Sequence, residues 1–166
     1  MNDHQAPKRD YRPLASIGES QAAIDEVIAA AQRTLRIFDI SLANRGFGSP
    51  ARIERLRQLL VAGRAHRILI ALHDTEGLER ECPRLLMLLR QFPMSLEVHR
   101  TMGEARNAMD PFVVADDQSV WHQMHHDQPR AIVALHSPSD AIPLMQRFEE
   151  IWELSEACAL GRVLGL

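Results

Sequence analysis

Three short apolar segments alternate with helical patterns in the first hundred residues, and this alternation constrains the fold more than any other feature. The predicted strands are 35–42, 66–73 and 95–99, and the helices between them begin at Pro50 and near Cys82-Pro83. The segment 66–73 is almost continuously apolar, as is typical of a strand buried on both faces. Strands that alternate with helices over short connections form a parallel sheet with right-handed crossovers.

The second half of the chain changes from this alternation to a hairpin pattern. Residues 112–116 and 119–122 are predicted strands around a short polar turn, and 131–136 is a further strand. A final helix after residue 137 places its apolar side chains on one face. Together, the two halves predict an α/β protein with a mixed, largely parallel β-sheet flanked by helices.

The length of 166 residues is sufficient for one domain with a sizeable core. We divide the chain into a polar N-terminal arm or linker at residues 1–19 and a single domain at residues 20–166. The arm contains prolines and glycine and has no sustained period. Ser20 has the character of a helix N-cap, and apolar residues follow it at helical spacing.

Composition excludes several classes of protein. Apolar residues make up 46% and charged residues 25% of the chain, which is typical of a globular protein and not of a disordered one. No segment approaches the ~18 apolar residues of a membrane span, and the first five residues lack the apolar core of a secretory signal. Cys82 and Cys158 are too few for a disulfide framework, so we expect a cytoplasmic protein.

Charge is distributed unevenly along the chain. The 19 basic and 22 acidic residues give a net charge of −3, which provides no overall basic footprint for nucleic acid. Most of the basic residues are arginines in the first 100 positions, whereas residues 101–166 are acidic overall. This asymmetry is either uneven decoration of a solvated surface or an attraction between two halves of a surface or two subunits.

The order of the predicted elements, with Phe148-x-x-x-Trp152 in the last helix, resembles one half of a phospholipase D superfamily protein over residues 20–156. In that family, the strand that enters the hairpin carries the motif His-x-Lys-x-x-x-x-Asp. The histidine is the nucleophile that forms a phosphoenzyme, and the lysine holds phosphate oxygens. Two such motifs, from two repeats or two subunits, face each other across a shared cleft.

The matching stretch of this chain departs from the motif at its chemistry. Alignment on Asp116 places Met109 at the position of the histidine and Pro111 at the position of the lysine. A thioether is a very weak nucleophile that cannot shuttle a proton, and proline carries no cation. The resemblance therefore implies a chain without catalytic residues, in which Asp116 serves as a turn or strand-end acceptor.

Polar side chains that follow the predicted strands form the candidate ligand site, because open α/β sheets bind ligands beyond the carboxyl ends of their strands. Imidazole and guanidinium groups there can recognise an anion or perform acid–base chemistry near neutral pH. The alternative is that these residues simply end strands. With Asp116 from the motif and His122 from the hairpin, the candidates are Asn44, Arg45, His73, Asp74, His99, Arg100, Asp116 and His122.

The densest group of histidines is His122, His125 and His126, with Asp127 beside it. A zinc site needs three or four nitrogen, oxygen or sulfur ligands that converge at about 2 Å. The chain has no His-Glu-x-x-His arrangement, and both cysteines are distant in sequence. We expect no metal and no cofactor, although the sequence leaves open whether the three histidines bind a metal.

These observations support three hypotheses from different classes. The first is a non-catalytic phospholipase D-like domain that acts in ligand binding or protein interaction. It would be a homodimer, with an acidic small molecule or a partner protein domain as a further partner and no membrane contact. The second is an enzyme of phosphodiester or phosphoryl transfer that uses a displaced histidine such as His99 or His122. The third, which we do not favour, is nucleic-acid binding through the arginine-rich first half, with affinity that falls steeply with salt.

Overall fold

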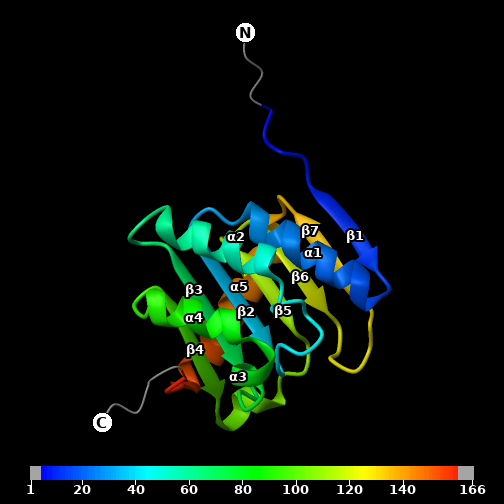
Figure 1. Ribbon diagram of the computed structural model, residues 1–166. Coiled ribbons are helices and arrows are strands. Elements are labelled where there is room, and N and C mark those ends of the chain that lie inside the picture. Colours follow the sequence, from blue (N-terminus) through cyan, green and yellow to red (C-terminus); the bar gives the residue numbers. More distant parts are fainter. Residues whose placement is uncertain (1–4, 161–166) are drawn as a thin grey trace, which may run out of the picture.

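An eight-stranded mixed sheet forms the centre of the computed structural model, which describes residues 5–160 (Figure 1). The strands are β1 (Asp10–Leu14), β2 (Thr34–Asp39), β3 (Arg67–Leu72), β4 (Leu96–Thr101), β5 (Phe112–Ala115), β6 (Ser119–Gln123), β7 (Ala131–Leu135) and β8 (Ser155–Ala157). Their order across the sheet is β1-β7-β6-β5-β2-β3-β4-β8.

The α/β class and the mixed, helix-flanked sheet are confirmed. The expectation of a largely parallel sheet is wrong, because two of the seven strand pairings in the described residues are parallel and five are antiparallel. Strand β3 pairs in parallel with both β2 and β4. The neighbours of this central unit, β5 next to β2 and β8 next to β4, are antiparallel to it. Parallel pairing is thus confined, among the described residues, to the three strands that alternate with helices in sequence.

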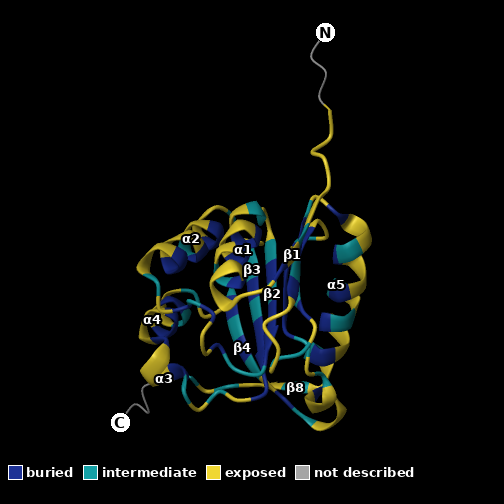
Figure 2. Ribbon diagram, turned by 90° about the vertical axis from the view of Figure 1, so that its right-hand side faces the viewer, coloured by how far each residue is buried: buried dark blue, intermediate teal, exposed yellow. Residues whose placement is uncertain are grey.

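Helices cover both faces of the sheet. They are α1 (Ile17–Ala30), α2 (Pro50–Val61), α3 (Leu78–Glu81), α4 (Pro83–Gln91) and α5 (Pro138–Glu153), with a 3₁₀ turn η1 at Gly103–Asn107. Figure 2 shows α1, α2 and α4 on one side of the sheet and α5 on the other. None of the helices in the described part of the chain combines the length and apolar character that a membrane span requires.

Each face of the sheet has its own apolar layer. Under α1, α2 and α4, the layer includes Ile24, Leu56, Ile68, Leu85 and Trp121. Under α5, it includes Phe38, Phe112 and Phe148. Burial of such side chains contributes about 1.5–3 kcal/mol each, so that both helical layers are held mainly by apolar contact.

The start of α2 follows the local chemistry that the sequence predicts. The Ser49 hydroxyl accepts a hydrogen bond from the Arg52 backbone N–H at 3.4 Å, and Pro50 occupies the first helical turn. A serine N-cap typically stabilises a helix by about 1 kcal/mol relative to alanine.

The N-terminal region differs from the predicted arm at residues 1–19. Residues 10–14 form β1, which pairs with β7, and α1 begins at Ile17 with Ser16 as its N-cap. Ser20, which the sequence predicts as the cap, is instead buried, and its hydroxyl accepts a hydrogen bond from the Trp121 indole at 3.0 Å. Strand β1 has no clear apolar alternation and contains a proline, which an edge strand tolerates, so its pairing comes from the tertiary structure.

Candidate functional site

The carboxyl ends of β2 and β3 and the beginning of β5 meet at one edge of the sheet, which we call the strand-end edge. The pairing of Phe38 with Phe112 and of Asp39 with Leu72 brings these ends together. Three polar residues, Asp39, His73 and Asp110, lie at or just beyond them. This is the edge at which open α/β sheets bind ligands, so the partners of these side chains decide what the edge can bind.

Arg45, a predicted ligand residue, forms an ion pair inside the protein. Its guanidinium donates to the Asp39 carboxylate at 2.6 Å and lies 5.0 Å from the centre of the Trp121 ring. Both members of the pair are buried. Burial raises the pKa of Asp39 by more than the hydrogen bond and charge of Arg45 lower it. Removing either partner would leave an uncompensated polar group in the interior.

His73 is held in one tautomer. Its Nε2 lies 2.6 Å from the carbonyl oxygen of Ala108, which can only accept, so Nε2 carries the proton. Nδ1 then accepts from the Thr101 hydroxyl. Burial lowers the pKa of His73, against the opposing effect of the Ala108 carbonyl, and the nearby positive charge of Arg106 lowers it further. Both ring nitrogens of His73 are therefore occupied by internal partners.

Asp110 organises a second charged group at the strand-end edge. Its carboxylate accepts from His122 Nε2 at 2.7 Å and from both terminal nitrogens of Arg147, which lies on α5. Burial acts to raise the pKa of Asp110, but the hydrogen bonds and charges of His122 and Arg147 outweigh it, and the net pKa is lowered. The predicted ligand residue His122 is therefore a partner of Asp110.

Sequence reasoning missed Asp110 and Arg147. Asp110 lies between Met109 and Pro111, inside the stretch aligned with the phospholipase D motif, where a carboxylate could have been noted. Arg147 is 37 residues away on α5, and no spacing or periodicity links the two. Their contact is set by how α5 crosses the sheet.

Met109 and Pro111 lie directly before β5. Met109 is 37% exposed, and its carbonyl oxygen accepts a hydrogen bond from the His126 backbone N–H at 2.8 Å. Pro111 is buried, and its carbonyl oxygen accepts from the Gln123 backbone N–H. The loop between β6 and β7 is thereby fastened beside Met109.

Asp116, the residue that matches the motif, lies at the opposite edge of the sheet. It follows β5 in a left-handed backbone conformation with φ of 55°. Its carboxylate accepts from the backbone N–H groups of Gln32, Arg33 and Thr34 at 2.9 Å each, where β2 begins. This geometry is that of a strand-end acceptor, and it removes Asp116 from the predicted ligand site.

Of three further candidates, two accept hydrogen bonds in loops and one is exposed on a strand. The carbonyl oxygen of Asn44 accepts a hydrogen bond from Gln21 at 2.8 Å. The Asp74 carboxylate accepts from the Glu76 backbone N–H at 2.9 Å. Arg100 is exposed on β4. None of these contacts points to a ligand.

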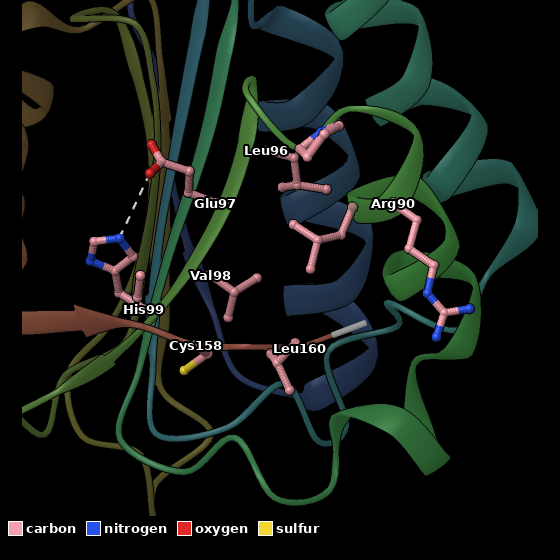
Figure 3. A pocket seen from close by; sticks show the side chains of 10 residues that line it. Arg90, Leu96, Glu97, Val98, His99, Cys158 and Leu160 are labelled. Carbon is pink, nitrogen blue, oxygen red and sulfur yellow. Dashed lines mark ion pairs between the residues drawn. The ribbon is translucent and has the colours of Figure 1, made fainter. Parts of the chain in front are cut away.

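His99 lies away from the strand-end group, near the β4–β8 border. Its ring stacks on Trp152 with centroids 3.6 Å apart, and Nδ1 lies 2.8 Å from the Ser155 hydroxyl. Burial lowers the pKa of His99, although Glu97 opposes the shift. Figure 3 shows Glu97 and His99 on the side of β4 away from Leu96 and Val98. These four residues are among those that line a cavity of about 350 Å³.

The structure therefore groups some of the candidates and separates others. Arg45, His73 and His122 lie at the strand-end edge, each with an internal partner. Asp116 and His99 lie elsewhere. The exposed side chains at the strand-end edge include Asp74, Met109 and several residues of the β6–β7 loop.

Residues 16–164 match the family described as a domain of unknown function, DUF7931. The chain belongs to this family. No curated protein sequence matches the chain. Because the match covers the described region from Ser16 onward, both helical layers and the strands from β2 to β8 are features of a DUF7931 domain, whereas β1 precedes the matched residues.

Solved structures resemble this DUF7931 chain in fold. The phospholipase D family member Nuc of Salmonella typhimurium has a TM-score of 0.60 and 13% identity, over 91% of this chain and 99% of that chain. NucT of Helicobacter pylori has a TM-score of 0.58 and 11% identity, over 91% and 100%. The archaeal chromatin protein TrmBL2 has a TM-score of 0.66 and 15% identity over 95% of this chain, which spans only 57% of TrmBL2. These similarities establish a phospholipase D-like fold.

Proposed function

We propose that this chain is a non-catalytic phospholipase D-like domain that acts by binding, and that it pairs with a second copy of itself. The sequence feature that carries the proposal is Met109 and Pro111, which alignment on Asp116 matches to the histidine and lysine of the family motif. A thioether and a pyrrolidine ring cannot form a phosphoenzyme or hold a phosphate oxygen by charge.

The surroundings of Met109 support this interpretation over a displaced nucleophile. His73 uses both ring nitrogens internally, and His122 donates to Asp110. His99, the other displaced histidine considered from the sequence, stacks on Trp152. A nucleophilic imidazole needs a free nitrogen within reach of the phosphorus atom. His73 has none, and His122 and His99 each have one ring nitrogen held by an internal hydrogen bond.

Turnover of bis(p-nitrophenyl) phosphate tests the absence of catalysis. We expect no release of nitrophenol above buffer, with an active phospholipase D family enzyme as the positive control. Release that disappears in His122→Ala or His99→Ala would establish the displaced-histidine enzyme and overturn the proposal.

Exposed methionines support self-association at the strand-end edge. Met109 is 37% exposed, and Met124 in the β6–β7 loop is 47% exposed. Methionine is adaptable and frequent at binding surfaces. In the family that the chain resembles, two motifs meet across this edge, so a second copy is the expected occupant, with an acidic small molecule or a partner domain as alternatives.

Light scattering coupled to size exclusion tests the pairing. We expect a dimer that becomes a monomer in Met109→Glu/Met124→Glu, because like charges would be brought together in the apolar contact. Met94→Glu is the matched control, since Met94 is 81% exposed but precedes β4 at the opposite edge of the sheet. A wild-type monomer, or a dimer insensitive to the double substitution, would refute the pairing.

Nucleic-acid binding is the second candidate function, and one observation favours it. TrmBL2, whose fold this chain resembles, is a chromatin protein with a novel mode of DNA binding, and several arginines of this chain on α2 and α4, such as Arg55 and Arg84, are exposed. Fluorescence anisotropy with a labelled duplex distinguishes the candidates. Our proposal predicts no binding at low salt, whereas a DNA-binding domain would bind and lose roughly 10³–10⁵ in affinity between about 50 and 200 mM salt.

We also place the chain in the cytoplasm. Both cysteines are free in the described structure, Cys82 in the core and Cys158 near β8. Free thiols are typical of a reducing compartment.

A further inference from the structure

The β6–β7 loop gathers three metal-ligating side chains at the strand-end edge. His125, His126 and Asp127 each offer one ligand atom, and these atoms all lie within 4.8 Å of one another. His126 Nδ1 is 3.1 Å from Asp127 Oδ1, and His125 Nδ1 is 3.8 Å from Asp127 Oδ2. The two imidazole rings are 4.7 Å apart. Two nitrogen donors thus converge on one carboxylate.

We propose that His125, His126 and Asp127 bind a divalent transition-metal ion, with zinc as the expected ion. Imidazole and carboxylate are established zinc ligands at about 2.0–2.2 Å, and three protein ligands leave a fourth position for water or another donor. The side chains are 31–71% exposed, which leaves them free to rotate toward a shared ion. This site is independent of the proposed function and differs from the expectation of no metal.

The hydrogen bond at His125 shows which ring nitrogen has a lone pair. The backbone N–H of Asp127 donates to His125 Nδ1 at 3.2 Å. A nitrogen that accepts a hydrogen bond carries a lone pair, and only such a nitrogen can bind a metal. An ion bound at Nδ1 would take the place of this N–H donor, on the side of the loop on which Asp127 lies.

Hydrogen bonds between backbone groups also hold the loop in place. The N–H of His126 donates to the Met109 carbonyl oxygen, and the N–H of Gln128 donates to the His125 carbonyl oxygen at 3.0 Å. The N–H of Met124 donates to the Arg130 carbonyl oxygen across the base of the loop. Because the backbone is already ordered, an ion would need to order only the ligand side chains.

The structure also separates His122 from this group. The sequence places His122, His125 and His126 together, but His122 Nε2 is bound to Asp110. Asp127 takes its place as the third ligand. The metal proposal therefore predicts that the adjacent triplet binds zinc without His122.

Isothermal titration of the full chain with zinc chloride, after dialysis against a chelator, tests the site. We expect about one zinc ion per chain, as for a single three-ligand site. His125→Ala/His126→Ala should abolish binding. Asp127→Asn should weaken it by at least the roughly 10–100-fold that loss of an outer-shell partner costs, because here a ligand itself is changed.

Two variants serve as controls. His136→Asn removes an exposed imidazole from another part of the molecule, and asparagine tolerates the φ of 54° at this position. His122→Gln removes the histidine that the sequence groups with the others. Both should bind zinc as the unchanged chain does, and circular dichroism should show that all variants are folded.

Two further measurements do not depend on the heat of binding. Zinc should shift the ring signals of His125 and His126 in NMR spectra and raise the Tm reversibly, since an ion that binds the folded state stabilises it. Absence of saturable binding, or binding that survives His125→Ala/His126→Ala, would overturn the proposal.

Discussion

The carboxylate of Asp110 is a hydrogen-bond acceptor shared by two neighbouring side chains at the strand-end edge. It accepts from His122 and, through two bonds, from Arg147. Charge-assisted and bidentate pairs are stronger than neutral hydrogen bonds. The side chain of Asp110 is only 16% exposed, so water cannot easily replace these partners.

Substitution of Asp110 should destabilise the fold. In Asp110→Asn, Arg147 and His122 lose their charged acceptor, and we expect a loss of about 1–3 kcal/mol in the free energy of unfolding, measured by urea denaturation. The variant should also lose part of the acid sensitivity. The pKa of Asp110 is lowered in the fold, so its contribution is complete above the unfolded pKa of about 3.9 and disappears as pH falls through the folded pKa.

Asp117→Asn is the control for this substitution, because Asp117 is exposed in the β5–β6 turn. It should leave the urea midpoint nearly unchanged. Equal stability of the two variants would show that the Asp110 group contributes nothing.

His73 should make the stability of the protein depend on pH near neutrality. Burial lowers its pKa. Below a pH of about 6.5, His73 therefore binds a proton in the unfolded chain but less readily in the folded chain. We expect the urea midpoint, measured with chelator present, to fall as the pH is lowered from about 7.5 to about 5.5. His73→Gln should weaken this slope, whereas His136→Asn should keep it. An unchanged slope in His73→Gln would contradict the assignment.

At the scale of elements, Asp116 joins the end of β5 to the beginning of β2. Its carboxylate accepts from three consecutive backbone N–H groups, those of Gln32, Arg33 and Thr34. Of these groups the Thr34 N–H is half-buried, and a half-buried N–H without a partner is costly. Asp116 thus makes a structural contact between two strands in this chain.

Two substitutions at Asp116 distinguish the contribution of its side-chain acceptor from that of its left-handed backbone conformation. Asp116→Ala removes the acceptor and places a β-carbon at φ of 55°, so we expect a loss of about 2–4 kcal/mol in the free energy of unfolding. Asp116→Asn keeps one acceptor oxygen and tolerates the left-handed conformation, so its loss should be smaller. Equal urea midpoints for the two variants would contradict this account.

At the scale of the whole molecule, β1 covers the edge of the sheet at β7. All five residues of β1 pair with β7, and Arg9 just before it donates to Ser137 and Asp140 at the start of α5. An uncovered strand edge is a template for aggregation. The N-terminal segment therefore covers β7 and is itself the edge strand on this side, where Pro13 limits further pairing.

Removal of residues 1–14 should lower the Tm by more than about 4 °C, the shift expected for roughly 1–2 kcal/mol in a domain of this size. Light scattering should show aggregation, because the β7 edge becomes free. Removal of residues 1–6 leaves β1 in place and should change neither quantity. Aggregation that is equal in both truncations would refute the role of β1.

The elements that the sequence predicts well are those with a local period. The strand at 66–73 and the helix that begins at Pro50 carry their signal in adjacent residues, as apolar continuity and as a Ser-Pro start. Strands β1 and β8 and the short helix α3 escaped prediction. Each is at most five residues long, without alternation of its own, and such segments are ordered by what they pair with.

By itself, the sequence determined the α/β class and the parallel pairing of the strands that alternate with helices, because both depend on residue type and short-range spacing. The interpretation of Met109 and Pro111 as a lost motif stays a prediction. Only the tertiary structure decided which charges are paired. Asp110 meets Arg147, and Asp116 lies at the opposite edge from His73, because β5 runs antiparallel to β2 and α5 crosses the other face. A side chain's partner is set by distance in space, which the order of residues does not contain.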